Sequence, residues 1–258
     1  MMKVHVLLTK EEINAERLRE NGKVAVVLDV LLATTTIISA LNEGAKEVIP
    51  VMDENEAFSL SQSLKHENFI LAGERDARPI EHFHYPSPTM LSPLVLGKSL
   101  ILSTTNGTIA LKKAESAERV YISSLLNNKR TAQQLLDCHL ESTIVIICSG
   151  NAGEVSLEDV YGAGHLIHSL LYLSQQSINM SDAAKMAFYL FLGNQYKASE
   201  LLSSSSVGNL FERYGLFDDL QLAATANTVS VLAVMKNGTA LLEEEHASQS
   251  EIRKVRDI

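Results

Sequence analysis

The segment KVAVVLDVLLATTTIISALNEG, residues 23–44, indicates the fold of this chain. Its first part, 23–30, is a nearly continuous apolar run, which is typical of a strand buried on both faces of a parallel sheet. Residues 35–44 follow with helical spacing, and Gly44 is expected to end that helix. A buried strand followed directly by a helix indicates one unit of an α/β protein.

The same alternation of strand and helix continues along the chain. Further strands are predicted at 3–8, 47–51, 68–72, 98–103, 119–123, 143–148 and 228–235, and further helices at 10–21, 53–66, 107–116, 129–140 and 156–174, with more helix to about residue 226. The KNGT sequence at 236–239 predicts a hairpin turn. The alternation favours a layered α/β/α fold with a mainly parallel or mixed sheet. Because ligands bind beyond the carboxyl ends of the strands in such sheets, residues that directly follow strands are the candidates for a site.

Two short segments of the chain resemble each other. TTTIISAL (34–41) and TTNGTIAL (104–111) share Thr-Thr and Ala-Leu pairs at the same positions. Either chance or an internal duplication explains the match, and a duplication would place two helix N-termini side by side. We predict one α/β catalytic domain over residues 1–245, with possible lobes at about 1–97 and 98–245. Residues 246–258 are predicted to be a charged, solvated tail.

The composition limits the class of protein. The 258 residues are 46% hydrophobic, enough for a sizeable core, and the net charge of -9 argues against nucleic acid or an anionic membrane as partner. No apolar run reaches the roughly 18 residues of a membrane helix, and no signal peptide is recognisable, so a soluble cytoplasmic protein is expected. Cys138 and Cys148 are predicted to be buried free thiols. The histidines show no metal pattern, and the helical pair His165 and His168 is interpreted as structural.

Two carboxylates directly follow predicted strands. Asp29 ends the apolar run 23–30, where it is either a cap or turn residue, a Mg²⁺ ligand or a nucleophile. Glu74 follows the strand 68–72, with Arg75 and Arg78 just beyond it. These three residues form either a surface ion-pair cluster or a second metal carboxylate with arginine for an anionic substrate.

Other polar segments also follow strands. Residues 103–108 offer hydroxyls, an amide side chain and backbone N–H groups at a helix start, which suits an anion but also serves as an ordinary cap. Ser156 to Asp159 has a capping-box pattern, in which Asp159 is the capping partner and the adjacent Glu158 can reach a metal. Asn127 and Asn128 follow the strand 119–123 and are either loop residues or ligand contacts.

Taken together, these motifs resemble a known family. DVLLATTTI, AGER, SPTML, STTNGTIAL, LLNN, CSGNAGEVSLED, SSVGNL and GLFDDL occur in the order found in 2-phosphosulfolactate phosphatases. The resemblance runs from about residue 24 to 219. It implies a Mg²⁺-dependent acid phosphatase that removes phosphate from 2-phospho-3-sulfolactate, a step toward coenzyme M, and that acts on related 2-hydroxy-acid phosphates. On this resemblance, the family's motif positions are Asp29, Glu74, Thr104, Thr105, Asn106, Gly107, Thr108, Glu158 and Asp159.

The chain departs from the family at two places. The first motif usually has arginine after Asp-Val-Leu, where this chain has Leu32, and the family's Gly-Phe-Asp…Asn-Ser-Pro segment is replaced by HFHYPSP at 82–88. A lost arginine removes a charged hydrogen bond of roughly 1.5–3 kcal/mol. Either Arg75, Arg78 or a histidine compensates, or the substrate differs, or the activity is impaired.

We therefore expect a Mg²⁺-dependent phosphatase of a small anionic 2-hydroxy-acid phosphate, with a homodimer as a possible assembly. The alternative is a catalytically weakened homologue that binds anions or regulates. The expected catalytic residues are Asp29, Glu74 and Glu158, and the expected metal ligands are these three with Asp159. The residues expected to bind substrate or phosphate are Thr34, Thr35, Arg75, Thr104, Thr105, Asn106, Gly107, Thr108 and Asn127.

Overall fold

A computed structural model describes residues 1–20, 22–64 and 68–243, so the predicted tail 246–258 lies outside the described residues. The strands are β1 (Lys3–Leu7), β2 (Lys23–Leu28), β3 (Glu47–Val51), β4 (Phe69–Arg75), β5 (Arg78–Pro79), β6 (Ser99–Ser103), β7 (Arg119–Ser123), β8 (Thr143–Cys148), β9 (Asn179–Met180), β10 (Ala233–Lys236) and β11 (Thr239–Leu242). The helices are the 3₁₀ helix η1 (Lys10–Glu12) and the α-helices α1 (Ala15–Leu18), α2 (Ala33–Asn42), α3 (Glu54–Ser63), α4 (Pro88–Leu91), α5 (Gly107–Ala114), α6 (Asn128–Cys138), α7 (Leu157–Leu173), α8 (Asp182–Gly193), α9 (Ala198–Ser204), α10 (Ser206–Tyr214) and α11 (Phe217–Ala223).

The strands form a mixed sheet in the order β5-β4-β6-β3-β11-β10-β7-β2-β8-β1-β9. One parallel block contains β7, β2, β8, β1 and β9, and a second contains β3, β6 and β4. The antiparallel hairpin β10–β11 joins the two blocks. Its turn has Asn237 and Gly238 at φ 52° and 79°, as the KNGT sequence predicts. Strands from 1–97 and from 98–245 alternate within both blocks, so the two possible lobes share one sheet.

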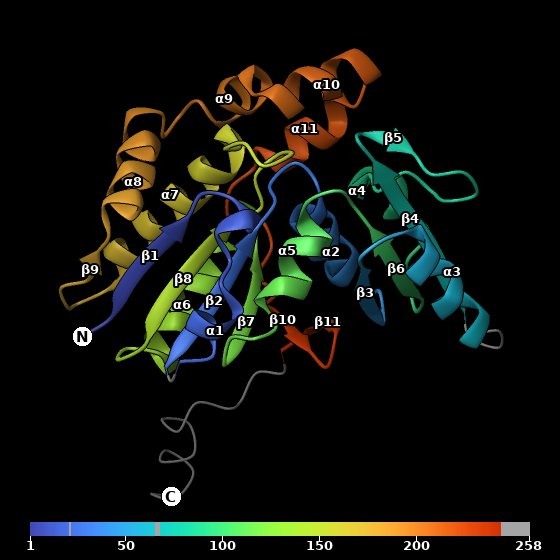
Figure 1. The fold of residues 1–258 in the computed structure, drawn as a ribbon. Helices are drawn as coiled ribbons and strands as arrows, with labels where there is room; N and C mark the ends of the chain where they lie inside the picture. The colour runs from blue at the N-terminus through green and yellow to red at the C-terminus, as the bar shows by residue number, and fades with distance from the viewer. Residues whose placement is uncertain (21, 65–67, 244–258) are drawn as a thin grey trace, which may run out of the picture.

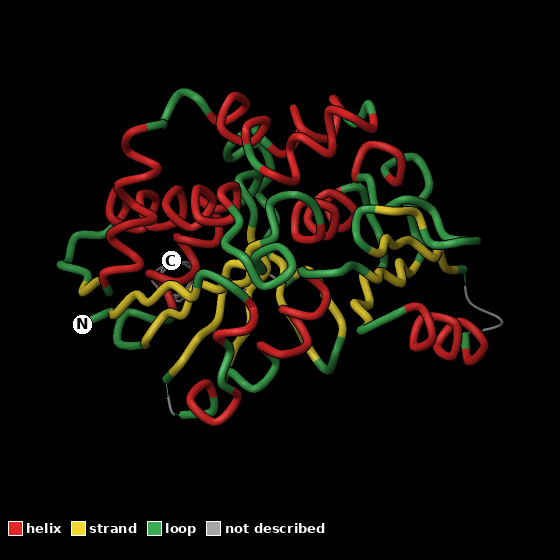
Figure 2. The backbone as a smooth tube through the Cα atoms, turned by 45° about the horizontal axis from the view of Figure 1, so that its top comes forward, coloured by secondary structure: helices red, strands yellow, loops and turns green. Residues whose placement is uncertain are grey.

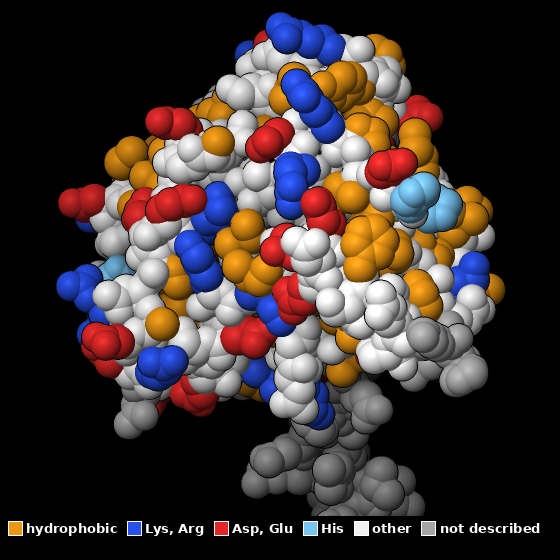
Figure 3. All heavy atoms as spheres, turned by 45° about the vertical axis from the view of Figure 1, so that its right-hand side comes forward, with side chains coloured by type: hydrophobic (Ala, Val, Ile, Leu, Met, Phe, Trp, Pro, Cys, Tyr) orange, Lys and Arg blue, Asp and Glu red, His pale blue; other side chains and the backbone are white. Residues whose placement is uncertain are grey.

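Helices cover both faces of the sheet, which confirms the predicted layered α/β/α fold (Figures 1 and 2). One core cluster packs α2 and α5 on one face of the sheet, and a second packs α6, α7 and α8 on the other. Helices α9, α10 and α11 lie across the top of the sheet in Figure 1. A third apolar cluster joins them to the turn after β2. The face that carries β4 and β5 has acidic, basic and apolar side chains interspersed (Figure 3).

Three local predictions need correction. The helix predicted at 10–21 is divided into η1 and the single turn α1, because Asn14 caps α1 by accepting the Arg17 amide at 2.9 Å. The strand predicted at 228–235 begins only at 233, since the amides of Asn227 and Val229 bond to the loop after β7 instead of a neighbouring strand. Cys148 is buried as predicted, but Cys138 is exposed.

No helix in the described parts of the chain has the length and apolarity needed to span a membrane.

Candidate active site

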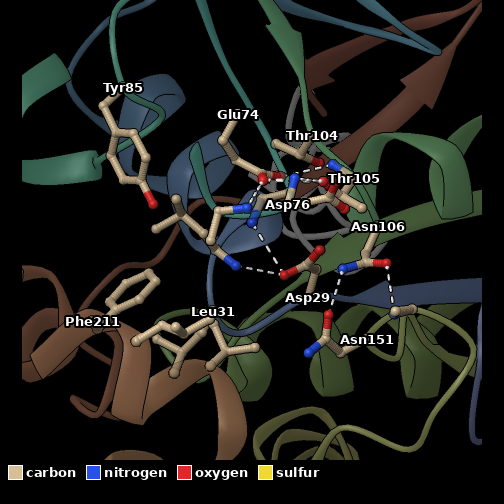
Figure 4. A pocket seen from close by; sticks show the side chains of 16 residues that line it. Asp29, Leu31, Glu74, Asp76, Tyr85, Thr104, Thr105, Asn106, Asn151 and Phe211 are labelled. Carbon is tan, nitrogen blue, oxygen red and sulfur yellow. Dashed lines mark hydrogen bonds between the residues drawn. The ribbon is translucent and has the colours of Figure 1, made fainter. Parts of the chain in front are cut away.

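A cavity of about 260 Å³ lies where the turns after β2, β4 and β6 meet α10 (Figure 4). The turn after β2 contributes a carboxylate and apolar side chains, the β4–β5 hairpin contributes two carboxylates, and the turn after β6 contributes hydroxyl and amide groups. The lining residues are Asp29, Leu31, Leu32, Ala33, Glu74, Asp76, Ala77, Tyr85, Thr104, Thr105, Asn106, Asn151, Ala152, Val207, Leu210 and Phe211.

Asp29 combines a structural contact with a position in the cavity. Its Oδ1 atom accepts the amides of Leu32 at 2.6 Å and Ala33 at 3.3 Å, which satisfies donors at the start of α2. Its Oδ2 atom lies against the start of α5, where a Cβ built on Gly107 would come within 2.4 Å of it. Burial, with a contribution from the charges of Glu74 and Glu158, raises the pKa of Asp29 to about 7. The cap and site interpretations of Asp29 are therefore compatible.

Glu74 ties the β4–β5 hairpin to the turn after β6. Its Oε1 atom accepts the Thr105 amide at 2.7 Å, and its Oε2 atom accepts the Thr105 hydroxyl at 3.0 Å and the Ala77 amide at 2.7 Å. The Thr105 hydroxyl oxygen in turn accepts the Asp76 amide at 2.9 Å. Asp76 and Ala77 have φ values of 51° and 60°, so the hairpin turns through two left-handed residues without glycine. These bonds hold Glu74 and Thr105 at the cavity wall.

The start of α5 presents unpaired backbone donors. Within the described chain, the amides of Asn106 and Gly107 have no hydrogen-bond partner. Thr104 and Thr108 bond reciprocally, each hydroxyl accepting the other residue's amide at 3.2 and 3.1 Å. The helix therefore begins in a fixed geometry with free N–H groups and the positive end of its dipole next to Asp29. Because a Gly107 Cβ would also lie 2.4 Å from the Ala33 Cβ, the starts of α2 and α5 are side by side, as a duplication would require.

The sequence interpretation missed several polar residues at or beside the cavity, namely Lys10, Asp76, Tyr85 and Asn151. The buried Lys10, which follows β1, donates from Nζ to Asn106 Oδ1 over 2.8 Å and pairs with Glu11 at 3.0 Å. Its position three residues after the end of β1 was the available signal. Tyr85 lines the cavity from the irregular segment after β5. Burial, together with the charge of Glu74, raises the pKa of Tyr85 well above its usual value, so its hydroxyl stays a hydrogen-bond donor.

The acidic pair at the start of α7 lies outside the cavity lining. Asp159 accepts the amides of Val30 at 2.8 Å and Gly150 at 3.1 Å, and Ser156 caps the helix by accepting the Asp159 amide. Burial raises the pKa of both Glu158 and Asp159. Across the residues that the structure describes, no three His, Cys, Asp or Glu side chains are close enough to hold a metal ion. Of the four expected metal ligands, the structure brings only Asp29 and Glu74 to the cavity.

The remaining predicted substrate contacts also have other partners. The Thr34 hydroxyl donates to the Asp29 carbonyl at 2.8 Å, and the Thr35 hydroxyl donates to the Val30 carbonyl at 2.8 Å. Arg75 does not line the cavity, is 58% exposed and pairs with a glutamate of α3 at 3.0 Å. Asn127 is buried, accepts the Ser124 amide and donates to a backbone carbonyl near β10. These side chains support the turns that carry the site.

The predicted structural role of the helical histidine pair agrees with the geometry of α7. His165 is buried against Phe191, and its Nδ1 atom lies 3.0 Å from the Asn128 side-chain amide. Burial lowers the pKa of His165 to about 4, so the ring is neutral near pH 7.

The fold and the cavity together define an α/β protein with an acidic pocket and unpaired backbone amides near the ends of its strands. A family model described as 2-phosphosulpholactate phosphatase matches residues 7–238. A protein named probable 2-phosphosulfolactate phosphatase from Clostridium perfringens (strain SM101 / Type A) is 36% identical over 241 residues, covering 92% of this chain and 95% of that protein. Proteins of the same name from Clostridium tetani and Symbiobacterium thermophilum are 34% and 37% identical, covering 92% and 86% of this chain and 99% and 95% of those proteins.

The chain belongs to the 2-phosphosulpholactate phosphatase family, which confirms the resemblance seen in its motifs.

Proposed function

We propose that this chain is a Mg²⁺-dependent phosphatase that hydrolyses the phosphate monoester of a small anionic 2-hydroxy acid. The observation that carries the proposal is the arrangement of Asp29 and Glu74 around a cavity that is also lined by Asn106, at the start of α5 (Figure 4). The names of the relatives make 2-phospho-3-sulfolactate the first substrate to test. They give no support to the alternative of a non-catalytic anion-binding homologue.

The charges of the cavity support a metal cofactor. Its lining includes the carboxylates of Asp29, Glu74 and Asp76, and within the described residues it includes no lysine or arginine. A phosphate dianion entering this cavity would be repelled unless a cation accompanied it. Mg²⁺ commonly binds one or two carboxylates and completes its shell with water and phosphate oxygens, so Asp29 Oδ2 and Glu74 would hold it. When bound, the ion would polarise the phosphoryl group and lower the pKa of a bound water.

The chain's own groups would orient the ester. The amides of Asn106 and Gly107 would donate to phosphate oxygens, where the α5 dipole favours negative charge. Lys10 would keep the Asn106 side chain in place, and the Tyr85 hydroxyl would donate into the cavity. In the reaction, a water oxygen forms a bond to phosphorus while the bond from phosphorus to the ester oxygen breaks. One water proton passes to the leaving oxygen, giving the hydroxy acid and inorganic phosphate.

The test is release of inorganic phosphate from 2-phospho-3-sulfolactate with Mg²⁺ and with a chelator. We expect activity that depends on Mg²⁺ and that falls by more than about tenfold in Glu74→Gln. Glu81→Gln is the matched control, because the Glu81 side chain is 89% exposed. Stabilisation by phosphate without any turnover, in a folded sample, would favour the non-catalytic alternative. A homodimer and a cytoplasmic location stay predictions from the sequence.

A further inference from the structure

The cavity has an apolar side that the hydrolysis step does not use. Leu31 and Leu32, from the turn after β2, face Val207, Leu210 and Phe211 of α10 across this side. Figure 4 shows Leu31 and Phe211 on the side of the cavity away from Glu74 and Thr105. Leu31, Leu32 and Phe211 are almost fully buried within the apolar cluster that fixes α10, at 6%, 7% and 2% exposure. This apolar wall (Leu31, Leu32, Val207, Leu210 and Phe211) is therefore a built part of the cavity.

Among the described residues, no lysine or arginine lines the cavity beside this wall. Lys10 is engaged with Asn106 and Glu11, and Arg75 is engaged with a glutamate on the outer side of the β4–β5 hairpin. Arg78 lines a separate recess on that outer side. A sulfonate placed against the apolar wall would thus be desolvated without a counter-charge, next to a carboxylate-rich lining. The wall instead suits a group that gains free energy by leaving water.

We propose, on the basis of the phosphatase function above, that the substrate of this chain carries an aliphatic group where 2-phospho-3-sulfolactate carries its sulfonate. The phosphate occupies the start of α5, and the aliphatic group packs against the apolar wall. Leu32 and Leu210 then determine specificity, because Leu32 represents the turn after β2 and Leu210 represents α10, the two elements that form the wall. The substrate class is the O-phosphate of a 2-hydroxy acid with a hydrocarbon side chain.

The direct test compares three substrates of the unmodified protein in the presence of Mg²⁺. 2-Phospho-3-sulfolactate is paired with the phosphate of 2-hydroxybutyrate, in which a methyl group replaces the sulfonate, and with 2-phospholactate, which is one carbon shorter. We expect kcat/KM to be at least about tenfold higher for the hydroxybutyrate ester than for the sulfonate, and about fourfold higher than for 2-phospholactate, as one buried methylene gives. A higher kcat/KM for the sulfonate overturns this inference and leaves the phosphatase function intact. No phosphate release from any of the three overturns both.

Arginine substitutions test the wall itself. Leu32→Arg places a cation in the turn after β2, and Leu210→Arg places one at a half-buried position of α10. In both variants the cation lies where the sulfonate would bind. Each is expected to raise the ratio of kcat/KM for the sulfonate over the hydroxybutyrate ester by about tenfold or more. This ratio does not depend on the fraction of enzyme that folds. The control is Met186→Arg on the exposed face of α8, which should leave the ratio unchanged. An unchanged ratio in both wall variants contradicts the assignment.

Discussion

Replacing Asp29 by asparagine removes the negative charge of the side chain and keeps its size. The asparagine oxygen can still accept the Leu32 and Ala33 amides that Asp29 Oδ1 accepts at 2.6 and 3.3 Å, so the start of α2 is preserved. The charge is lost, and with it a ligand for the expected Mg²⁺. We therefore expect Asp29→Asn to lose phosphatase activity while the folded protein becomes more stable above pH 7 without metal.

The magnitude follows from the pKa of Asp29, which burial raises from 3.8 to about 7. A difference of about three pKa units corresponds to about 4 kcal/mol of destabilisation when the buried group is ionised. The pKa of Asp29 is higher in the folded state than in the unfolded state. Its contribution to the free energy of unfolding is therefore fully present below pH 3.8 and is lost as the pH rises through 7. Between pH 5 and pH 8, this single group should lower the free energy of unfolding by about 3 kcal/mol.

The assay is urea unfolding of both proteins at pH 5 and pH 8 with a chelator present. The difference between the two proteins isolates Asp29 from other titrating groups, and Asp182→Asn is the control because its side chain is 94% exposed. Added Mg²⁺ should then stabilise the unmodified protein but not Asp29→Asn. If Asp29→Asn is the less stable protein at pH 8 without metal, Asp29 is a stabilising cap and the reasoning about its charge fails.

Three further outcomes are expected. Gly107→Ala should lower the melting temperature and should lower kcat by at least about tenfold, because the new Cβ would lie 2.4 Å from Asp29 Oδ2. A fully active variant of unchanged stability would contradict this. Lys10→Met should raise KM by about tenfold, since it removes the 2.8 Å bond to Asn106, and steady-state kinetics would measure it. Arg75→Ala should change kcat/KM by less than about twofold, because its exposed ion pair contributes little; a large loss would restore its predicted role in binding substrate.

Local signals in the sequence were sufficient for most of the fold. The buried strand β2, the helix α2 and the Asn237-Gly238 turn each follow from a short apolar run, helical spacing or turn chemistry. The errors occurred where a local polar group or a distant partner decided the structure. Asn14 divided a segment of helical periodicity by capping a new helix within it. Residues 228–232 have strand composition, but they bond to a loop that the sequence does not identify.

The candidate site was predictable where its residues lie at the carboxyl ends of strands, as Asp29 does after β2, Glu74 in the last part of β4 and Thr105 after β6. The rule that ligands bind at the carboxyl ends of strands could not indicate Leu210 or Phe211. Helix α10 reaches the cavity through apolar packing with residues almost 180 positions earlier in the sequence. The rule also could not separate the carboxylates of α7 from those of the cavity. Both sets lie at or beyond the carboxyl ends of strands, and only the packing directs the Asp159 carboxylate to backbone amides instead.

The meeting of β2 with β4 and β6 at one cavity depends on the hairpin between their blocks. Three successive antiparallel pairings, β7–β10, β10–β11 and β11–β3, make the second block run in the opposite sense to the first. In a flat sheet, the carboxyl ends of β2 and β6 would therefore face opposite edges. Five pairings separate these two strands, and a twist of about 20–25° at each turns one relative to the other by roughly 100–125°. The strand directions then differ by only about 55–80°, so their ends incline toward one another, and β10–β11 positions the site without lining it.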